Sequence, residues 1–207
     1  MRDDRLLLAG LTAAYAAFAW AFRGPRGRFW QRMTATGVAL GGLALATEPQ
    51  LRARVRRPRQ RDAAIGLGAA AGLYVVFRFG DRMARRIMPK GALEIDQAYA
   101  LRALRPTPEI AARLAFVIAP AEELFWRGFV QRRLQRKLGR WKGAAVASWV
   151  YGGAHLATAN LTLVGAATTA GAFWSALEAA GVSMPALIAS HVAWDVWIFL
   201  LQPTRPL

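Results

Sequence analysis

The chain has 207 residues, which is enough for one domain and gives no reason to expect two. It contains no cysteine, which excludes disulfides, thiolate metal sites and a cysteine nucleophile. Hydrophobic residues make up 55% of the chain, a high fraction for a soluble protein of this length. The 28 Lys and Arg outnumber the 12 Asp and Glu, so the formal net charge is +16.

The charged residues are grouped in blocks. Stretches almost free of charge, among them residues 6–22, 63–77 and 143–177, alternate with short segments dense in arginine. A soluble helix would carry its charges along one face, so this pattern indicates membrane spans joined by solvated loops. Basic residues between spans are attracted to anionic lipid headgroups, each by about 1 kcal/mol. We therefore predict membrane lipids as partners and no binding of nucleic acid.

The apolar blocks predict an all-α, polytopic membrane helical bundle of about seven transmembrane helices. In chain order, we expect these helices at residues 6–22, 33–47, 63–79, 109–131, 143–158, 161–180 and 184–201. Residues 81–105 mix Leu and Tyr with Asp, Glu and Arg, as in a helix that lies on the membrane surface. We therefore divide one integrated membrane domain into N-terminal spans with a surface segment, residues 1–107, and a catalytic helical bundle, residues 108–201.

The loop at residues 132–142 indicates how the bundle is oriented. It is short, contains six basic residues and has no acidic residue. Because cytoplasmic loops are enriched in Lys and Arg, we predict that this loop faces the cytoplasm. Frequent Arg and Ala are typical of a bacterium with a GC-rich genome, so the predicted location is the bacterial inner membrane.

Charged residues inside a span are costly, and the middle of the 109–131 helix contains Glu122, Glu123 and Arg127. Glu123 and Arg127 are four residues apart, which places them on one helical face as an ion pair. Glu122 points about 100° away, so it stays available for chemistry and independent of Arg127. Structural salt bridges between helices would explain the same pattern, so these residues alone leave both readings open.

The chain has two histidines, and both lie in predicted spans. His155 follows Tyr151 by four residues and His191 precedes Asp195 by four, so each pair shares one helical face. At 1.5 Å per residue, the two histidines, Asp195 and Glu122 lie roughly 11 to 20 Å from the cytoplasmic end of their helices. They thus fall in one layer of a core about 30 Å thick. We expect them to converge on one cavity nearer the cytoplasmic face.

Three motifs in this order resemble a known family. Glu-Glu-x-x-x-Arg begins at Glu122, aromatic-x-x-x-His ends at His155, and His-x-x-x-Asn/Asp begins at His191. Together they resemble the CPBP (CAAX protease and bacteriocin-processing, or Abi) intramembrane proteases over residues 108–201. The resemblance implies an all-helical membrane fold that cleaves peptide or protein substrates. Some members cleave beside a prenylated cysteine, and others act in bacteriocin maturation or self-immunity.

The resemblance also implies the catalytic roles. Glu122 and His155 would activate the attacking water, and His191 with Asp195 would bind the oxyanion. Asp195 stands where the best-known members have Asn, and an ionised carboxylate cannot donate a hydrogen bond to an oxyanion. It would instead orient His191 through the other ring nitrogen or join a shell of metal ligands.

The remaining motif residues have supporting roles by the same resemblance. Glu123 and Arg127 would support their helix, while Tyr151 stands where Phe is usual and adds a hydroxyl near His155. Whether the reaction uses a divalent metal such as zinc stays open, with His155, His191 and Glu122 as candidate ligands.

Other classes fit the sequence less well. The chain has no His-Glu-x-x-His, Gly-x-Ser-Gly or Gly-x-Gly-Asp motif, which disfavours the other intramembrane hydrolases. The main alternative to a hydrolase is a non-enzymatic membrane immunity or scaffold protein of the same fold. A proton-coupled carrier is a further alternative, because the same ionisable residues would form a relay.

Overall fold

The computed structural model describes residues 2–56, 58–88 and 90–202, and none of these residues lies in a β-strand. The N-terminal helices are α1 (Arg2–Arg23), α2 (Phe29–Thr47), α3 (Pro49–Val55), α4 (Gln60–Ile87) and α5 (Gly91–Tyr99). The C-terminal helices are α6 (Thr107–Arg113), α7 (Ala119–Glu122), α8 (Arg132–Leu138), α9 (Arg140–Ala154), α10 (Leu161–Ala179) and α11 (Met184–Trp194). The predicted all-α class is confirmed.

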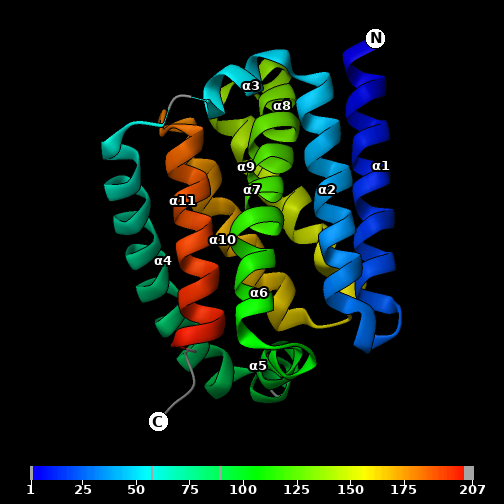
Figure 1. Ribbon diagram of the computed structural model, residues 1–207, viewed down its shortest axis with the longest axis vertical. Coiled ribbons are helices and arrows are strands. Elements are labelled where there is room, and N and C mark those ends of the chain that lie inside the picture. The colour runs from blue at the N-terminus through cyan, green and yellow to red at the C-terminus, as the bar shows by residue number, and fades with distance from the viewer. Residues whose placement is uncertain (1, 57, 89, 203–207) are drawn as a thin grey trace.

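The helices α6, α7 and α8 form one continuous column through the middle of the molecule (Figure 1). The segments that join them, Leu114–Ile118 and Glu123–Gln131, are π-helical. The helix α11 likewise continues into a π-helical segment, Asp195–Leu201. Such segments are rare in proteins, and those that do occur are often found at functional sites. Two of the three begin at a residue that the motifs single out, Glu123 or Asp195.

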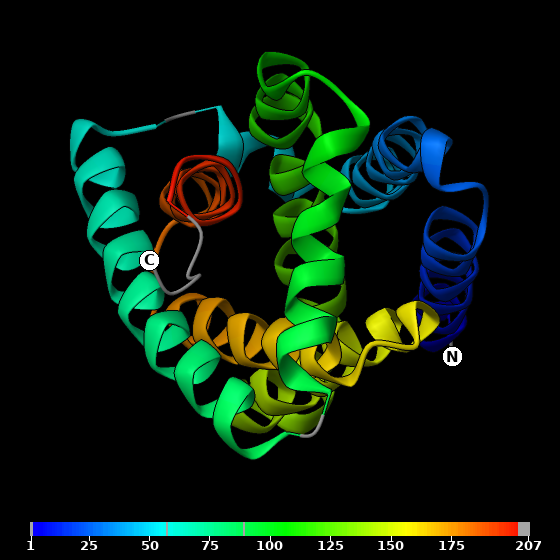
Figure 2. The same cartoon turned by 90° about the horizontal axis from the view of Figure 1, so that it is seen from below.

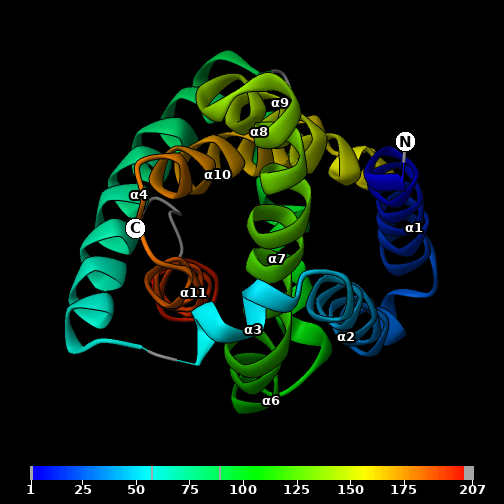
Figure 3. The ribbon, with the colours of Figure 1, turned by 90° about the horizontal axis from the view of Figure 1, so that it is seen from above.

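The other helices surround this column. The helices α1 and α2 lie on one side of it, and α4 and α11 lie on the other (Figures 1 and 3). The helices α9 and α10 pack against each other and close the side between α1 and α4 (Figures 2 and 3). Side chains from both sides of residue 107 form one core, which includes Phe18, Met33, Phe125, Tyr151 and Met184.

Each of the seven predicted spans is helical, with bounds that differ at the ends. Three helices are long and apolar enough to cross a membrane by length and composition, namely Asp3–Arg23, Gln60–Ile87 and Met184–Leu201. The predicted helix at 63–79 runs on to Ile87. Asp81 accepts a hydrogen bond at 2.9 Å from Arg85, one turn later, and such a pair supports the helix beyond its apolar part.

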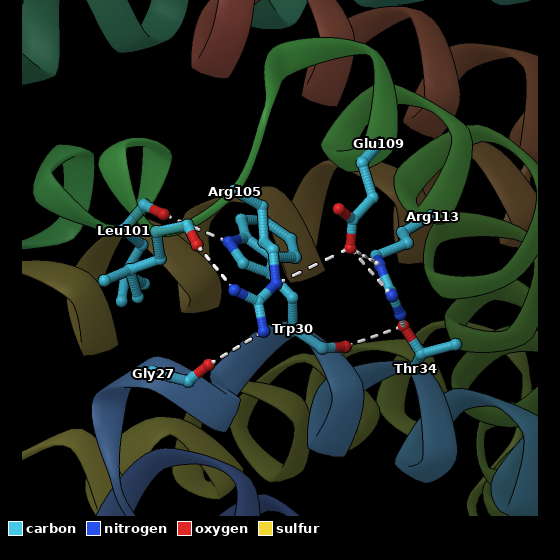
Figure 4. Close-up of polar contacts among 8 residues, drawn as sticks. Gly27, Trp30, Thr34, Leu101, Arg105, Glu109 and Arg113 are labelled. Atoms are coloured by element: carbon cyan, nitrogen blue, oxygen red, sulfur yellow. Dashed lines mark hydrogen bonds and ion pairs between the residues drawn. The ribbon is translucent and has the colours of Figure 1, made fainter.

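The predicted surface segment is shorter than expected because its first residues belong to α4. It consists of α5 and a 3₁₀ turn, Ala100–Leu104, which together run across the lower end of the bundle (Figures 1 and 2). Figure 4 shows how this segment is attached to the start of α2. The Trp30 indole Nε1 donates to the Leu101 carbonyl at 3.0 Å, and Arg105 donates to the Gly27 carbonyl at 3.2 Å.

Candidate active site

Glu122 is the last residue of α7, and its side chain is buried, with 8% of the residue exposed. The Tyr151 hydroxyl on α9 donates a hydrogen bond of 2.7 Å to Glu122 Oε2. No ion pair of Glu122 is present in the part of the chain that the structure describes. Its carboxylate is therefore held by a neutral donor. The sequence predicted the Tyr151 hydroxyl near His155 and did not predict this contact, because no local helical spacing connects residues that are 29 positions apart.

Glu123 lies in a different environment, with no exposed surface. Its Oε1 accepts a hydrogen bond of 3.2 Å from Arg127, as the spacing predicts, and lies 2.8 Å from His191 Nδ1. Arg127 also donates to the Gly171 carbonyl at 3.2 Å, and its guanidinium lies 4.8 Å from the centre of the Tyr151 ring. Glu123 and Arg127 are thus partners, and Glu122 does not depend on Arg127.

His155 begins the 3₁₀ turn that follows α9. Its Nδ1 lies 3.1 Å from the Tyr151 carbonyl oxygen, which can only accept, so Nδ1 carries the proton and Nε2 is left as an acceptor. The imidazole lies against the rings of Phe18 and Phe22, with centroids 5.3 and 5.9 Å away. These α1 residues are part of the site's wall. Sequence reasoning missed them, because an apolar span shows no sign of which rings face a histidine.

His191 on α11 is fixed on two sides. Its ring stacks on Trp174 of α10, with centroids 3.9 Å apart and 22° between the planes. Its Nδ1 contacts Glu123, so Glu123 rather than Asp195 is the carboxylate that orients the ring. Asp195 Oδ1 lies 3.7 Å from Nε2, on the ring's other side and beyond hydrogen-bond distance. The separation leaves Nε2 open to another partner.

A cavity of about 610 Å³ lies between these helices. Glu122, His155 and His191 all line it, as predicted, together with Tyr151 and Asp195. Most of the remaining wall is apolar and comes from helices far apart in the sequence, with Phe22, Phe29, Trp30, Met33, Phe77, Ile95, Leu114 and Phe199 among its members. A polar cluster in an apolar cavity is the usual form of a small-molecule or peptide site.

The sequence left the use of a divalent metal open, and a zinc site would need at least three protein ligands. Among the described residues, no three His, Asp or Glu side chains gather as a ligand set. His155 uses Nδ1 on a carbonyl, and His191 uses Nδ1 on Glu123, so each ring offers one nitrogen to the cavity. One nitrogen from each ring is all that a metal-ligating histidine uses. The described donors fall short of a zinc site because no three of them converge on one point.

Residues 106–197 match the family model described as type II CAAX prenyl endopeptidase Rce1-like. The match is to the predicted family of CAAX proteases and covers the C-terminal part of the chain. The match contains every candidate residue, namely Glu122, Glu123, Arg127, Tyr151, His155, His191 and Asp195. No curated protein and no solved structure matches the chain. The matched family is one of CAAX-type endopeptidases. Together with the three helices of this chain that are long and apolar enough to cross a membrane, it indicates an integral membrane protein.

Proposed function

We propose that this chain hydrolyses a peptide bond inside the membrane, with Glu122 and His155 activating the water. The observation that carries the proposal is the convergence of Glu122, His155 and His191 on one largely apolar cavity. A water-excluding wall strengthens each electrostatic interaction with the reacting groups, since the effective dielectric constant is lower than in bulk water. Structural ion pairs scattered among helices would have no reason to share such a cavity.

In this mechanism Glu122 takes a proton from the water as the water oxygen attacks the scissile carbonyl carbon. The unprotonated Nε2 of His155 accepts the water's other hydrogen bond and orients it. The peptide C–N bond then breaks, and the proton held by Glu122 passes to the leaving amine. Every step uses groups that line the cavity, and no step is routed through a metal.

His191 binds the oxyanion through Nε2, because Glu123 occupies its other nitrogen. The Glu123 side chain, which also contacts Arg127, stabilises positive charge on the ring. Asp195 lies beside Nε2 and acts by charge on His191 rather than by donating to the oxyanion. The assignment differs from a literal transfer of the family's Asn, which would donate an amide hydrogen.

The substrate class follows from the cavity wall and the family description. A mostly apolar cavity of this size suits a peptide that carries an apolar side chain or lipid next to the scissile bond. A CAAX-type prenylated peptide and a bacteriocin-like leader are the two candidates. We place the protein in a bacterial inner membrane with the basic 132–142 loop in the cytoplasm. The cavity does not support a site nearer that face, because its wall reaches Ile95 of α5 at the opposite end of the bundle.

The test is a cleavage assay of the purified protein in lipid nanodiscs. The panel contains a prenylated CAAX-type peptide, the same peptide without the prenyl group, and bacteriocin-like leader peptides. We expect wild-type cleavage of at least one class, detected as new termini by mass spectrometry, and none by Glu122→Ala. Equal product from both proteins would refute the assignment of Glu122. No product from a folded wild-type protein across the panel would favour an immunity or scaffold role.

A further inference from the structure

A second pocket, of about 330 Å³, lies at the turn between α8 and α9, at the end of the bundle away from α5 (Figures 1 and 3). Its four lining residues are Arg132, Gln135, Arg136 and Arg140, each of which has a polar or charged end on an apolar stem. It is separate from the proposed active site, since the two pockets share no residue. Three guanidinium groups around one depression raise the question of what neutralises them.

The local backbone brings these side chains together. Residues 132, 135 and 136 lie on one face of α8, since they are three and four positions apart. Gly139 then reverses the chain with a φ of 82°, in the region that favours glycine, so that Arg140 at the start of α9 faces back toward α8. Gly143 allows the close approach, because a Cβ there would lie 2.5 Å from the Gln135 backbone.

Five of the six basic residues of this loop divide into two groups, and the sixth, Lys142, lies on α9 outside the pocket. One group is neutralised by acidic residues near the N-termini of α1 and α3. Arg133 lies 2.8 Å from Asp3 and 2.6 Å from Glu48, and Lys137 pairs with Asp4. The pocket group consists of Arg132, Arg136 and Arg140. Arg136 shares the carboxylates of the first group only at longer range, 3.9 Å from Asp3 and 3.7 Å from Glu48.

Within the pocket group, only Arg132 has a close carboxylate. Its Nη2 lies 3.0 Å from Glu178 Oε1, while its Nε is buried without a hydrogen-bond partner among the described residues. Arg136 has its nearest carboxylates at 3.7 and 3.9 Å, beyond hydrogen-bond distance. Arg140 forms no ion pair in the described part of the chain, and its guanidinium lies 5.8 Å from the Trp141 ring. The pocket therefore keeps excess positive charge.

Glu178 does not offset this excess for the other arginines. Gln131 and Gln135 donate to its Oε2 at 2.9 and 2.8 Å, while Arg132 donates to its Oε1. Three donors thus hold its carboxylate, and its charge offsets that of Arg132, the one arginine that it contacts. A ligand that brings its own negative charge would complete the pocket.

We infer that this pocket binds a phosphate group through Arg136 and Arg140, with Arg132 and Gln135 forming its floor. Guanidinium forks match phosphate oxygens in pairs, which makes arginine the residue of choice for this group. Two large apolar side chains flank the turn and are exposed, Leu138 at 44% and Trp141 at 59%. Trp is enriched at the membrane interface. An anionic phospholipid headgroup there and a soluble phosphate ester are the two sources of the same chemistry.

The first experiment measures lipid binding to the purified full chain in detergent by native mass spectrometry. Phosphatidylglycerol is compared with zwitterionic phosphatidylcholine for the wild type and for the double variant Arg136→Gln and Arg140→Gln. We expect the double variant to bind phosphatidylglycerol about tenfold or more weakly, because two charge-assisted hydrogen-bonding groups are lost. The matched control is Lys142→Gln, an exposed charge on α9 outside the pocket, which should bind as the wild type does.

Two further measurements make the result decisive. Conversion of Arg136 and Arg140 to Lys keeps the positive charge but loses the paired N–H donors of the guanidinium group. Lipid binding by this variant should lie between that of the wild type and that of the Gln variant, and it remains a test if the Gln variant folds poorly. Excess inorganic phosphate and glycerol phosphate then identify the source. Displacement of the lipid shows that soluble phosphate also occupies the pocket, and persistence of the lipid shows a headgroup site. The inference is overturned if the folded Gln variant binds phosphatidylglycerol as tightly as the wild type does.

Discussion

Glu122 and Glu123 are neighbours in the chain, yet their carboxylates lie in opposite environments. Glu122 faces the cavity and accepts a hydrogen bond from a neutral hydroxyl of Tyr151. Glu123 is fully buried between Arg127 and His191. The helix turns by about 100° per residue, which is enough to give two adjacent carboxylates different partners. In the proposed mechanism, a single dipeptide thus provides both the reacting carboxylate and a structural one.

The two histidines extend the comparison. His155 is held through a backbone carbonyl and apolar rings, so its Nε2 meets the cavity with no fixed charge on the opposite nitrogen. His191 is held through a buried carboxylate and a stacked Trp174. The surroundings of the two imidazoles therefore suit the two proposed roles, with His155 beside the attacking water and His191 beside the developing negative charge. The predictions below separate these two halves of the site.

The largest expected effect is on activity when the reacting carboxylate is neutralised. Glu122→Gln should lower the rate constant of cleavage by about 10²- to 10⁴-fold, since it removes the general base. Its amide oxygen still accepts from Tyr151, so the thermal unfolding temperature should stay close to that of the wild type. The two values are measured by cleavage kinetics and by thermal unfolding in detergent. A variant that unfolds early but cleaves normally would reverse the roles of the two glutamates.

The second effect is on stability when the structural carboxylate is neutralised. Glu123→Gln leaves Arg127 buried without its compensating charge, and breaking a buried ion pair this way costs about 3 to 5 kcal/mol. Adding Arg127→Met should recover most of the free energy of unfolding, because no charge is then left buried without its partner. Cleavage should stay low in the double variant, since His191 still lacks its carboxylate. Full recovery of activity would remove Glu123 from the orientation of His191.

The third prediction concerns Asp195 and the choice between metal and metal-free chemistry. Asp195→Asn removes a charge 3.7 Å from His191 Nε2 and supplies an amide donor. In the proposed mechanism cleavage should change by less than about tenfold, or about 1.4 kcal/mol in the barrier, and can rise. A zinc site that uses Asp195 predicts instead that bound zinc and turnover fall together. Metal content by elemental analysis and kinetics on the same preparation decide between them.

Several contacts of the site could be predicted because they join residues that are close in the sequence. Each of the pairs Glu123 with Arg127 and His191 with Asp195 spans four residues, so the helix alone brings its members together. Charged residues inside apolar spans marked Glu122 as well. Helix positions followed from the blocks of apolar residues, although α4 extends past its apolar part through an Asp–Arg pair.

The remaining contacts could not be predicted, since they join helices whose mutual rotation depends on packing. The bond from Tyr151 to Glu122 and the contact from Glu123 to His191 each cross between helices. The wall residues Phe18 and Phe22 lie in an apolar span where every position resembles the next. Helix rotation is fixed by ridge and groove packing over the whole surface, which a single sequence does not display.

The last prediction extends the comparison to a third glutamate, Glu94, on the cavity's α5 wall. Like Glu122, Glu94 accepts a hydrogen bond from a hydroxyl. The Oγ1 of Thr162 donates to Glu94 Oε2 at 2.6 Å, and the backbone N–H of Thr162 donates to the same oxygen at 2.8 Å. Unlike Glu122, it lies outside the membrane-spanning helices. The Thr162 side-chain and backbone hydrogen bonds, aided by Lys90, lower the pKa of the Glu94 carboxyl from its ordinary 4.5.

A carboxyl whose pKa is lowered by folding contributes stability above about pH 4.5, and that contribution is lost as the pH falls through the lowered pKa. At pH 6, Glu94→Gln should therefore speed hydrogen exchange of the α5 amides by about fivefold, the effect of one lost hydrogen bond. The difference between variant and wild type should shrink below pH 4. Asp96→Asn is the matched control on the same helix, because its half-exposed side chain contacts Arg85. A difference that persists unchanged at low pH would show that the Glu94 charge does not fasten α5.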